Sequence, residues 1–135
     1  MIFIMSLTSE SQEQANVTRW ARMRGARLVG LTRRGMGVLR HLTGGDTLVI
    51  VAHGCADSIG TAHDAVTYTP ASLYETLSPY LAGREGLHLD LACCSCQPFA
   101  DELQNMVGNR IMVTGRDHDW AFGPGYNPAD YRRDD

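Results

Sequence analysis

Short hydrophobic runs alternate with amphipathic stretches along most of this chain. The segment 46–56 holds four consecutive large apolar residues between a Gly-Gly pair and a His-Gly pair, which is typical of a strand buried on both faces. In 87–92 three leucines alternate with His88 and Asp90, which is the period of a strand. Further strands are predicted at 2–7, 26–32 and 110–114.

Apolar residues at helical spacing predict three longer helices. The first runs to about Arg24 and ends at Gly25, the second spans 69–83 and the third spans 97–108. A proline stands near the start of the second and third helices, where a missing N–H is tolerated. Segment 33–45 fits either a short helix or a loop with a hydrophobic anchor, and the tail from Gly115 is predicted to be loop.

From residue 46 onward the order is strand, loop, helix, strand, loop, helix, strand. Strands that alternate with helices pair in parallel through right-handed crossovers, so we expect one α/β domain over residues 1–135. Sites in such sheets form where loops leave the carboxyl ends of the strands. The segments HGCADS (53–58) and CCSCQP (93–98) are therefore predicted to lie at the same edge of one sheet.

The residues at this edge suit nucleophilic catalysis by a thiol. A cysteine attacks a carbonyl as its thiolate, and an imidazole can accept the proton and later protonate the leaving group. Cys93 precedes a predicted helix, whose positive end favours the thiolate, and His53 ends the neighbouring strand. Gly54 offers a backbone N–H to an oxyanion without a side chain in the way.

This pattern resembles the caspase-like cysteine peptidases, which include caspases, gingipains, separase, the self-cleaving domains of bacterial toxins and CHAT domains. The similarity rests on VIVAHG at 49–54 and LDLACCS at 89–95. The separation of 40 residues between His53 and Cys93 is near the roughly 50 residues typical of caspases. The resemblance implies a three-layer α/β sandwich with a mostly parallel central sheet, in which Cys93 is the nucleophile, His53 its base and Gly54 part of the oxyanion site.

The resemblance covers about residues 45–115 and implies a cysteine endopeptidase that needs neither a metal nor an organic cofactor. Its substrates would be proteins or peptides, and the resemblance suggests a bacterial effector or toxin setting. In these families the loop after the last strand shapes the substrate pocket, which assigns Asp117 and Trp120 to substrate binding. Alternatively, Trp120 packs onto the core together with Phe122.

Departures from the family pattern leave alternatives open. Cys94 directly follows Cys93 and becomes the nucleophile if the strand ends one residue later. The caspase pentapeptide is absent, because ACCSC lacks its Gln and Gly. No carboxylate that orients the histidine can be matched to the family; Asp46 and Asp57 are the nearby candidates, and either also fits a turn.

Two other classes of function use the same residues. A caspase-like module with an incomplete pocket would bind proteins without cleaving them. A zinc-stabilised binding domain would take His53, Cys55, Cys96 and either Cys93 or Cys94 as ligands, although the one-residue gaps are tighter than in most zinc sites. The remaining histidines are expected at the surface or in turns: His41, His63, His88 and His118.

Charge is unevenly distributed along the chain, whose net charge is −3. All 12 basic residues are arginines, and seven of them lie in segment 17–45, which contains no acidic residue. This segment fits either a patch for an anionic activator or a solvated helix with its following loop. Nucleic acid is not favoured as a partner, because Trp20 is the only aromatic residue among these arginines.

No apolar run approaches the roughly 20 residues that span a bilayer, so no membrane partner is expected. The apolar opening MIFIMSL lacks the basic start and cleavage site of a signal peptide and is predicted to be a strand. We therefore expect a cytoplasmic protein, or one exported without a conventional signal peptide. In that setting the four cysteines, three of them within four residues, favour chemistry or metal binding over structural disulfides.

Overall fold

A computed structural model describes residues 1–7, 10–30, 32–54, 58–60 and 67–132. Its centre is a sheet of five parallel strands in the order β2-β1-β3-β7-β8. The strands are β1 (Ile2–Ser6), β2 (Arg27–Val29), β3 (Thr47–Val51), β7 (His88–Ala92) and β8 (Met112–Thr114). All five strands predicted from the sequence are present, and their parallel pairing is confirmed.

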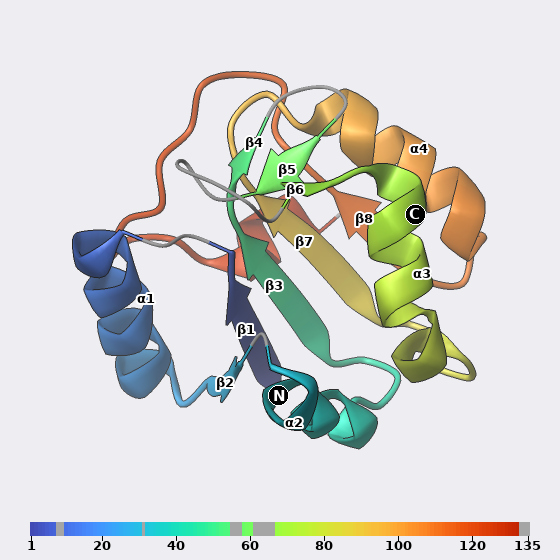
Figure 1. Ribbon diagram of the computed structural model, residues 1–135, viewed down its shortest axis with the longest axis horizontal. Coiled ribbons are helices and arrows are strands. Elements are labelled where there is room, and N and C mark those ends of the chain that lie inside the picture. Colours follow the sequence, from blue (N-terminus) through green and yellow to red (C-terminus); the bar gives the residue numbers. More distant parts are fainter. Residues whose placement is uncertain (8–9, 31, 55–57, 61–66, 133–135) are drawn as a thin grey trace.

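Helices cover both faces of this sheet (Figure 1). One face carries α1 (Ser11–Arg24) and the C-terminal tail (residues 115–132), which ends in the short helix η2 (Pro128–Tyr131). The other face carries α2 (Arg33–Met36), η1 (Gly37–His41), α3 (Pro70–Leu81) and α4 (Gln97–Val107). The predicted three-layer α/β sandwich with a mostly parallel central sheet is therefore confirmed.

The two faces of the sheet have separate cores because side chains alternate along each strand. Leu89 and Leu91 of β7 join the larger core beneath α3 and α4. Trp20 of α1 and Tyr126 of the tail pack with Val49 on the opposite face. All five residues of β7 are buried, so any polar side chain on this strand lies inside the protein.

Local sequence signals determine where the helices begin and end. The Thr69 hydroxyl accepts a hydrogen bond from the N–H of Ser72 at 3.1 Å, and Ser72 Oγ accepts one from the N–H of Thr69 at 2.9 Å. This capping box starts α3, and Pro70 takes the first helical position. Gly25 ends α1 with φ at 66°, in the left-handed region that glycine adopts without a steric penalty.

Residues 53–68 contain more regular structure than the predicted loop. β4 (His53–Gly54), β5 (Ile59–Gly60) and β6 (Thr67–Tyr68) form a small antiparallel sheet in the order β4-β5-β6. Strands of two residues are too short to leave a periodic pattern in the sequence. The ambiguous segment 33–45 contains α2 and η1, so its helical alternative is correct.

The helices of this fold are short. The longest in the described part of the chain, α1, has 14 residues, whereas a helix needs about 20 apolar residues to span a bilayer. Accordingly, none of the described helices has both the length and the apolar character that crossing a membrane requires.

Candidate functional site

The two motif segments lie side by side at the carboxyl edge of the sheet. β3 and β7 pair in parallel with Val51 opposite Ala92, so the chain leaves both strands at the same level. A Cβ atom placed on Gly54 would lie 3.2 Å from both the Cβ and the Sγ of Cys93. Gly54 therefore packs closely against Cys93, and the prediction that the two segments share one edge is confirmed. The imidazole of His53 pairs with Glu13, and the structure does not place it in contact with the Cys93 thiol.

The Cys93 thiol is buried and hydrogen-bonded. Only 1% of Cys93 is exposed, and its side chain joins the core beneath α3 and α4. A hydrogen bond with Cys96 raises the pKa of Cys93, and burial raises it further. The same hydrogen bond lowers the pKa of Cys96 to about 7.

Cys94 faces the C-terminal tail instead of the core beneath α4. Its sulfur accepts a hydrogen bond from the backbone N–H of Trp120 at 3.1 Å and lies 2.7 Å from the carbonyl oxygen of the same residue. Cys94 is half-buried, so it is more exposed than Cys93. The structure thus offers two adjacent thiols in different surroundings, and Cys94 stays the alternative nucleophile.

His53 has a carboxylate partner that the sequence analysis missed. Its Nε2 lies 2.9 Å from Oε2 of Glu13, in the first turn of α1. Both side chains are partly exposed, at 44% for His53 and 36% for Glu13. A carboxylate on one ring nitrogen holds an imidazole in one orientation and leaves the other nitrogen for proton transfer. Glu13 is therefore placed to orient His53.

Asp46, one of the two carboxylates expected to orient His53, lies at the opposite end of β3. It accepts hydrogen bonds from the N–H and hydroxyl of Thr43 at 2.8 and 3.0 Å and pairs with the amino group of Met1 at 3.3 Å. The extended chain between Asp46 and His53 spans roughly 20 Å. Asp46 is therefore not the carboxylate that orients His53, and its alternative interpretation as a turn residue is correct. Asp57, the other candidate, lies outside the described residues.

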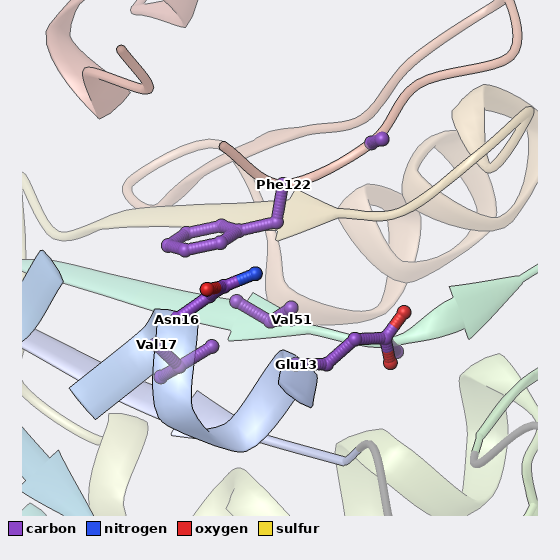
Figure 2. Close-up of a pocket in the computed structure, with 7 residues that line it drawn as sticks. Glu13, Asn16, Val17, Val51 and Phe122 are labelled. Atoms are coloured by element: carbon purple, nitrogen blue, oxygen red, sulfur yellow. The ribbon is translucent and has the colours of Figure 1, made fainter. Parts of the chain in front are cut away.

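A small pocket lies beside Glu13, the partner of His53 (Figure 2). Its volume is about 70 Å³, and its lining residues are Glu13, Asn16, Val17, Val51, Ala52, Ala121 and Phe122. The wall combines the apolar side chains of Val51 and Phe122 with the polar groups of Glu13 and Asn16. A pocket of this size can hold a small apolar group beside Glu13.

The two tail residues expected to bind substrate have different surroundings. Asp117 is exposed, and a hydrogen bond with Nδ1 of His118 at 2.8 Å lowers its pKa. The Trp120 ring packs over the Arg116 guanidinium at 4.6 Å, and its Nε1 donates to the Tyr131 hydroxyl at 3.1 Å. Trp120 also lines a cavity of about 270 Å³ in the tail. Substrate binding by Asp117 or Trp120 stays a prediction.

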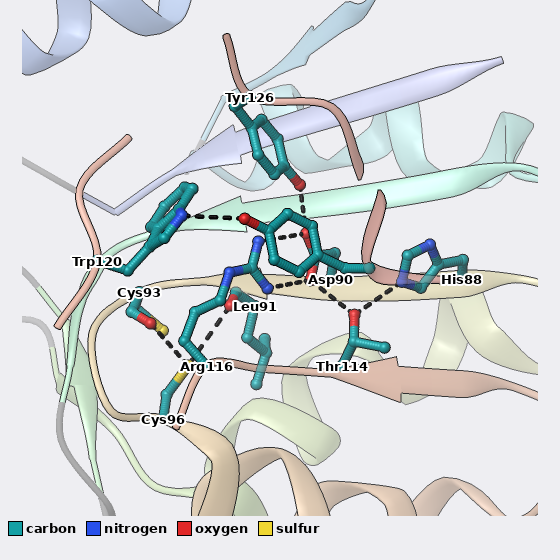
Figure 3. A network of polar contacts seen from close by, with 10 residues as sticks. His88, Asp90, Leu91, Cys93, Cys96, Thr114, Arg116, Trp120 and Tyr126 are labelled. Carbon is teal, nitrogen blue, oxygen red and sulfur yellow. Dashed lines mark hydrogen bonds and ion pairs between the residues drawn. The ribbon is translucent and has the colours of Figure 1, made fainter. Parts of the chain in front are cut away.

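A buried ion pair beneath the C-terminal tail was also missed (Figure 3). Asp90 of β7 accepts two hydrogen bonds from the guanidinium of Arg116, at 2.7 and 2.9 Å. The hydroxyls of Thr114, at 2.6 Å, and Tyr126 donate to the same carboxylate. A carboxylate at the centre of a strand buried on both faces is a sequence signal for such a network, because a buried charge needs a partner.

His88 was expected at the surface, but only 1% of it is exposed. It is the first residue of β7, and its Nε2 lies 2.7 Å from Oγ1 of Thr114. Burial lowers the pKa of His88 below its ordinary value of 6.5. The surface expectation for His88 is therefore wrong; His41 and His118 are exposed, and His63 lies outside the described residues.

Acid is expected to destabilise the fold through His88. The unfolded chain binds a proton near pH 6.5, whereas burial of His88 opposes protonation in the folded protein. This contribution to stability is complete above pH 6.5 and is lost as the pH falls toward the lower pKa of the folded state. Urea unfolding at about pH 5–8 measures this effect. The free energy of unfolding should fall less for His88→Gln than for the parent protein as the pH is lowered over this range. Equal losses in the two proteins would contradict this prediction.

The zinc hypothesis has limited support from the described side chains. Cys93, Cys94 and Cys96 are free thiols. Among the residues that the structure describes, no group of three or more His, Cys, Asp or Glu side chains is placed to hold a metal ion. Cys55, another proposed ligand, lies outside those residues.

Two arginines of segment 17–45 lie over aromatic rings. The guanidinium of Arg24 lies 5.7 Å from the centre of the Trp20 ring, and that of Arg27 lies 5.5 Å from the Phe3 ring. Both arginines are exposed, so their stems cover apolar surface while their charges face water. An anionic activator at this segment stays a prediction.

Comparisons with known proteins do not assign the chain to a family. No protein-family model matches it, and no curated protein sequence matches it. The resemblance to caspase-like peptidases therefore rests on the motif residues alone, and its support is the contact between the two motif segments at one sheet edge.

Proposed function

We propose that the chain is a cysteine endopeptidase in which Cys93 attacks the peptide bond and His53 is its general base. One observation carries this proposal: the segment of His53 and Gly54 meets the segment of Cys93 at the carboxyl edge of the sheet, where the side-chain position of Gly54 faces Cys93. The His53 imidazole points to Glu13, so it must turn toward Cys93 before it can accept the proton. The substrates are proteins or peptides, and the proposed reaction uses neither a metal nor an organic cofactor.

In this reaction His53 removes the proton of Cys93, and the thiolate sulfur adds to the carbonyl carbon. The backbone N–H groups of Gly54 and Cys93 donate hydrogen bonds to the oxyanion that forms. His53 then protonates the leaving amine, and water hydrolyses the thioester to restore the thiol. Glu13 keeps the imidazole oriented through its hydrogen bond with Nε2.

Burial of Cys93 defines what must move before a substrate can bind. A Cβ atom on Gly54 would also lie 3.0 Å from Cγ2 of Ile59, which belongs to the same core cluster as Cys93. Since Cys93 is only 1% exposed, a substrate can reach its sulfur only after residues packed around it move. The same burial favours our second candidate, a caspase-like interaction module that keeps the residue pair but does not cleave.

Cys94 is an alternative nucleophile for the same proposed reaction. Its half-buried sulfur accepts a hydrogen bond from the backbone N–H of Trp120 and donates one to the carbonyl oxygen of the same residue. If Cys94 is the nucleophile, the proposed activity is unchanged and only the attacking atom differs.

Three wider parts of the proposal follow from the family resemblance or from charge alone: caspase-like ancestry, a bacterial effector or toxin setting, and an anionic activator at segment 17–45.

Incubation of the protein with a degenerate peptide mixture, followed by mass spectrometry of new peptide termini, tests this proposal. We expect the parent protein and Cys94→Ser to produce the same cleavage sites, and Cys93→Ser to produce none. Cys94→Ser is the matched control, because it removes a neighbouring thiol at the same sheet edge. Cleavage by Cys93→Ser would rule out Cys93, and no cleavage by any of the three proteins would favour the interaction module.

A further inference from the structure

Cys93 and Cys96 form a close pair of thiols at the start of α4 (Figure 3). The two residues flank the turn at Cys94 and Ser95, and Cys96 is the N-cap of α4. The thiols share a hydrogen bond, and Cys96 Sγ also donates to the carbonyl oxygen of Cys93 at 3.1 Å. Residues that flank such a turn have Cα atoms less than about 7 Å apart, which is the range that a disulfide needs.

Cys96 is fully buried and its thiol donates to two carbonyl oxygens, yet several neighbouring groups lower its pKa. The hydrogen bond from Cys93 lowers the pKa of Cys96 to about 7, and a backbone hydrogen bond and the positive charge of Arg116 act in the same direction. Cys96 also stands at the positive end of α4, which has 11 residues. A thiol with a lowered pKa beside a second thiol is the arrangement from which a disulfide forms after oxidation.

We infer that Cys93 and Cys96 are a redox-active dithiol, which hydrogen peroxide oxidises to an intramolecular disulfide. The Cys96 thiolate attacks one peroxide oxygen, which gives a sulfenic acid and a hydroxide that takes up the proton Cys96 has lost. The Cys93 sulfur then attacks the sulfenic sulfur, and the hydroxyl group leaves with the Cys93 proton as water. Two thiols are oxidised, one peroxide is reduced to two waters, and a dithiol reductant reverses the change.

Cys94 takes no part in this pair because of its position. Its sulfur contacts the backbone of Trp120 in the tail, whereas Cys93 and Cys96 both lie in the core beneath α4. Cys96 Sγ lies 3.4 Å from the carbonyl oxygen of Leu91, on the strand that leads to Cys93. The three neighbouring cysteines therefore divide into one pair and one single thiol.

The consequence for catalysis rests on the proposed function, because Cys93 belongs to both the dithiol and the proposed active site. A disulfide removes the Cys93 sulfur as a nucleophile, so oxidation stops peptide cleavage until the bond is reduced. Formation of the disulfide itself does not depend on peptidase activity.

Cysteine mapping after peroxide treatment tests the inference. The reduced, folded protein is treated with hydrogen peroxide, and the remaining thiols are then alkylated with iodoacetamide in denaturant. We expect a monomer that has lost the mass of two hydrogen atoms, in which Cys55 and Cys94 carry the alkyl group and Cys93 and Cys96 do not. Dithiothreitol should restore four alkylatable thiols, the full cysteine count of the chain.

Serine variants separate the pair from the neighbouring thiols. Cys94→Ser should form the same disulfide as the parent protein, and Cys96→Ser should lose it completely. A bond that includes Cys94 or Cys55, bonds between molecules, or oxidation of single thiols without a bond would overturn the inference. A mapped Cys93–Cys96 disulfide in a protein that cleaves no peptide would uphold the inference and count against the proposed function, so the two failures are distinguishable.

Discussion

Replacement of Asp90 by asparagine is expected to lower the free energy of unfolding by about 3–5 kcal/mol, because it removes one partner of a buried ion pair. The Arg116 and Asp90 side chains are 1% and 0% exposed, so water cannot replace the lost carboxylate. The Arg116 guanidinium would then remain buried without a counter-charge. The hydroxyls of Thr114 and Tyr126 would also lose part of their acceptor.

Urea unfolding followed by tryptophan fluorescence measures this loss. The matched control is Glu85→Gln, because Glu85 pairs with Arg110 at the surface, where the two side chains are 65% and 75% exposed. That control should change the free energy of unfolding by about 0–1 kcal/mol. Similar losses for Asp90→Asn and Glu85→Gln would contradict the structural role of the buried pair.

A milder variant keeps the prediction testable if Asp90→Asn does not fold. Tyr126→Phe removes one hydrogen bond to the Asp90 carboxylate and leaves the ion pair and the aromatic packing in place. We expect it to lower the free energy of unfolding by about 0.5–3 kcal/mol. No change in this variant, measured in the same urea titration, would show that the Tyr126 hydroxyl does not stabilise the network.

Replacement of His53 by alanine is expected to lower the rate of peptide cleavage by about 10²- to 10⁴-fold, which is the usual contribution of a positioned general base. The buried Cys93 thiol has a raised pKa, so it is deprotonated at neutral pH only with the help of a base. Glu13→Gln should give a smaller loss, because the amide oxygen can still accept the hydrogen bond that orients the ring.

Initial cleavage rates on one peptide identified from the degenerate mixture measure these effects. His41→Ala is the matched control, because His41 is an exposed histidine at the end of η1 and should leave the rate unchanged. A rate for His53→Ala equal to that of the parent protein would exclude His53 as the base. A loss in His41→Ala as large as that in His53→Ala would indicate a general effect of histidine removal.

The parts of the fold that were predicted correctly have long local patterns. The apolar residues of β3 and β7 and the leucine spacing of α3 are visible within one segment each, and the structure confirms these elements. β4, β5 and β6 have two residues each, and their pairing depends on contacts that a local pattern does not contain.

The same distinction between local patterns and long-range packing applies to the candidate site. His53 and Cys93 were predicted as site residues because each follows a recognisable strand, and the parallel pairing that brings the ends of these strands together is confirmed. Glu13 lies 40 residues before His53, and Arg116 lies 26 residues after Asp90. Such partners are determined by packing across the fold, so a sequence pattern can indicate that Asp90 needs a cation without showing which arginine supplies it.

The most direct test of the central claim is to identify the sulfur atom that an electrophilic peptide modifies. The reduced protein is incubated with a mixture of peptide acyloxymethyl ketones, and the modified residue is located by mass spectrometry. We predict modification at Cys93 in the parent protein and in Cys94→Ser, and its loss in His53→Ala although the thiol is still present. Modification at Cys94, or equally fast modification of Cys93 with and without His53, would contradict a catalytic Cys93–His53 pair.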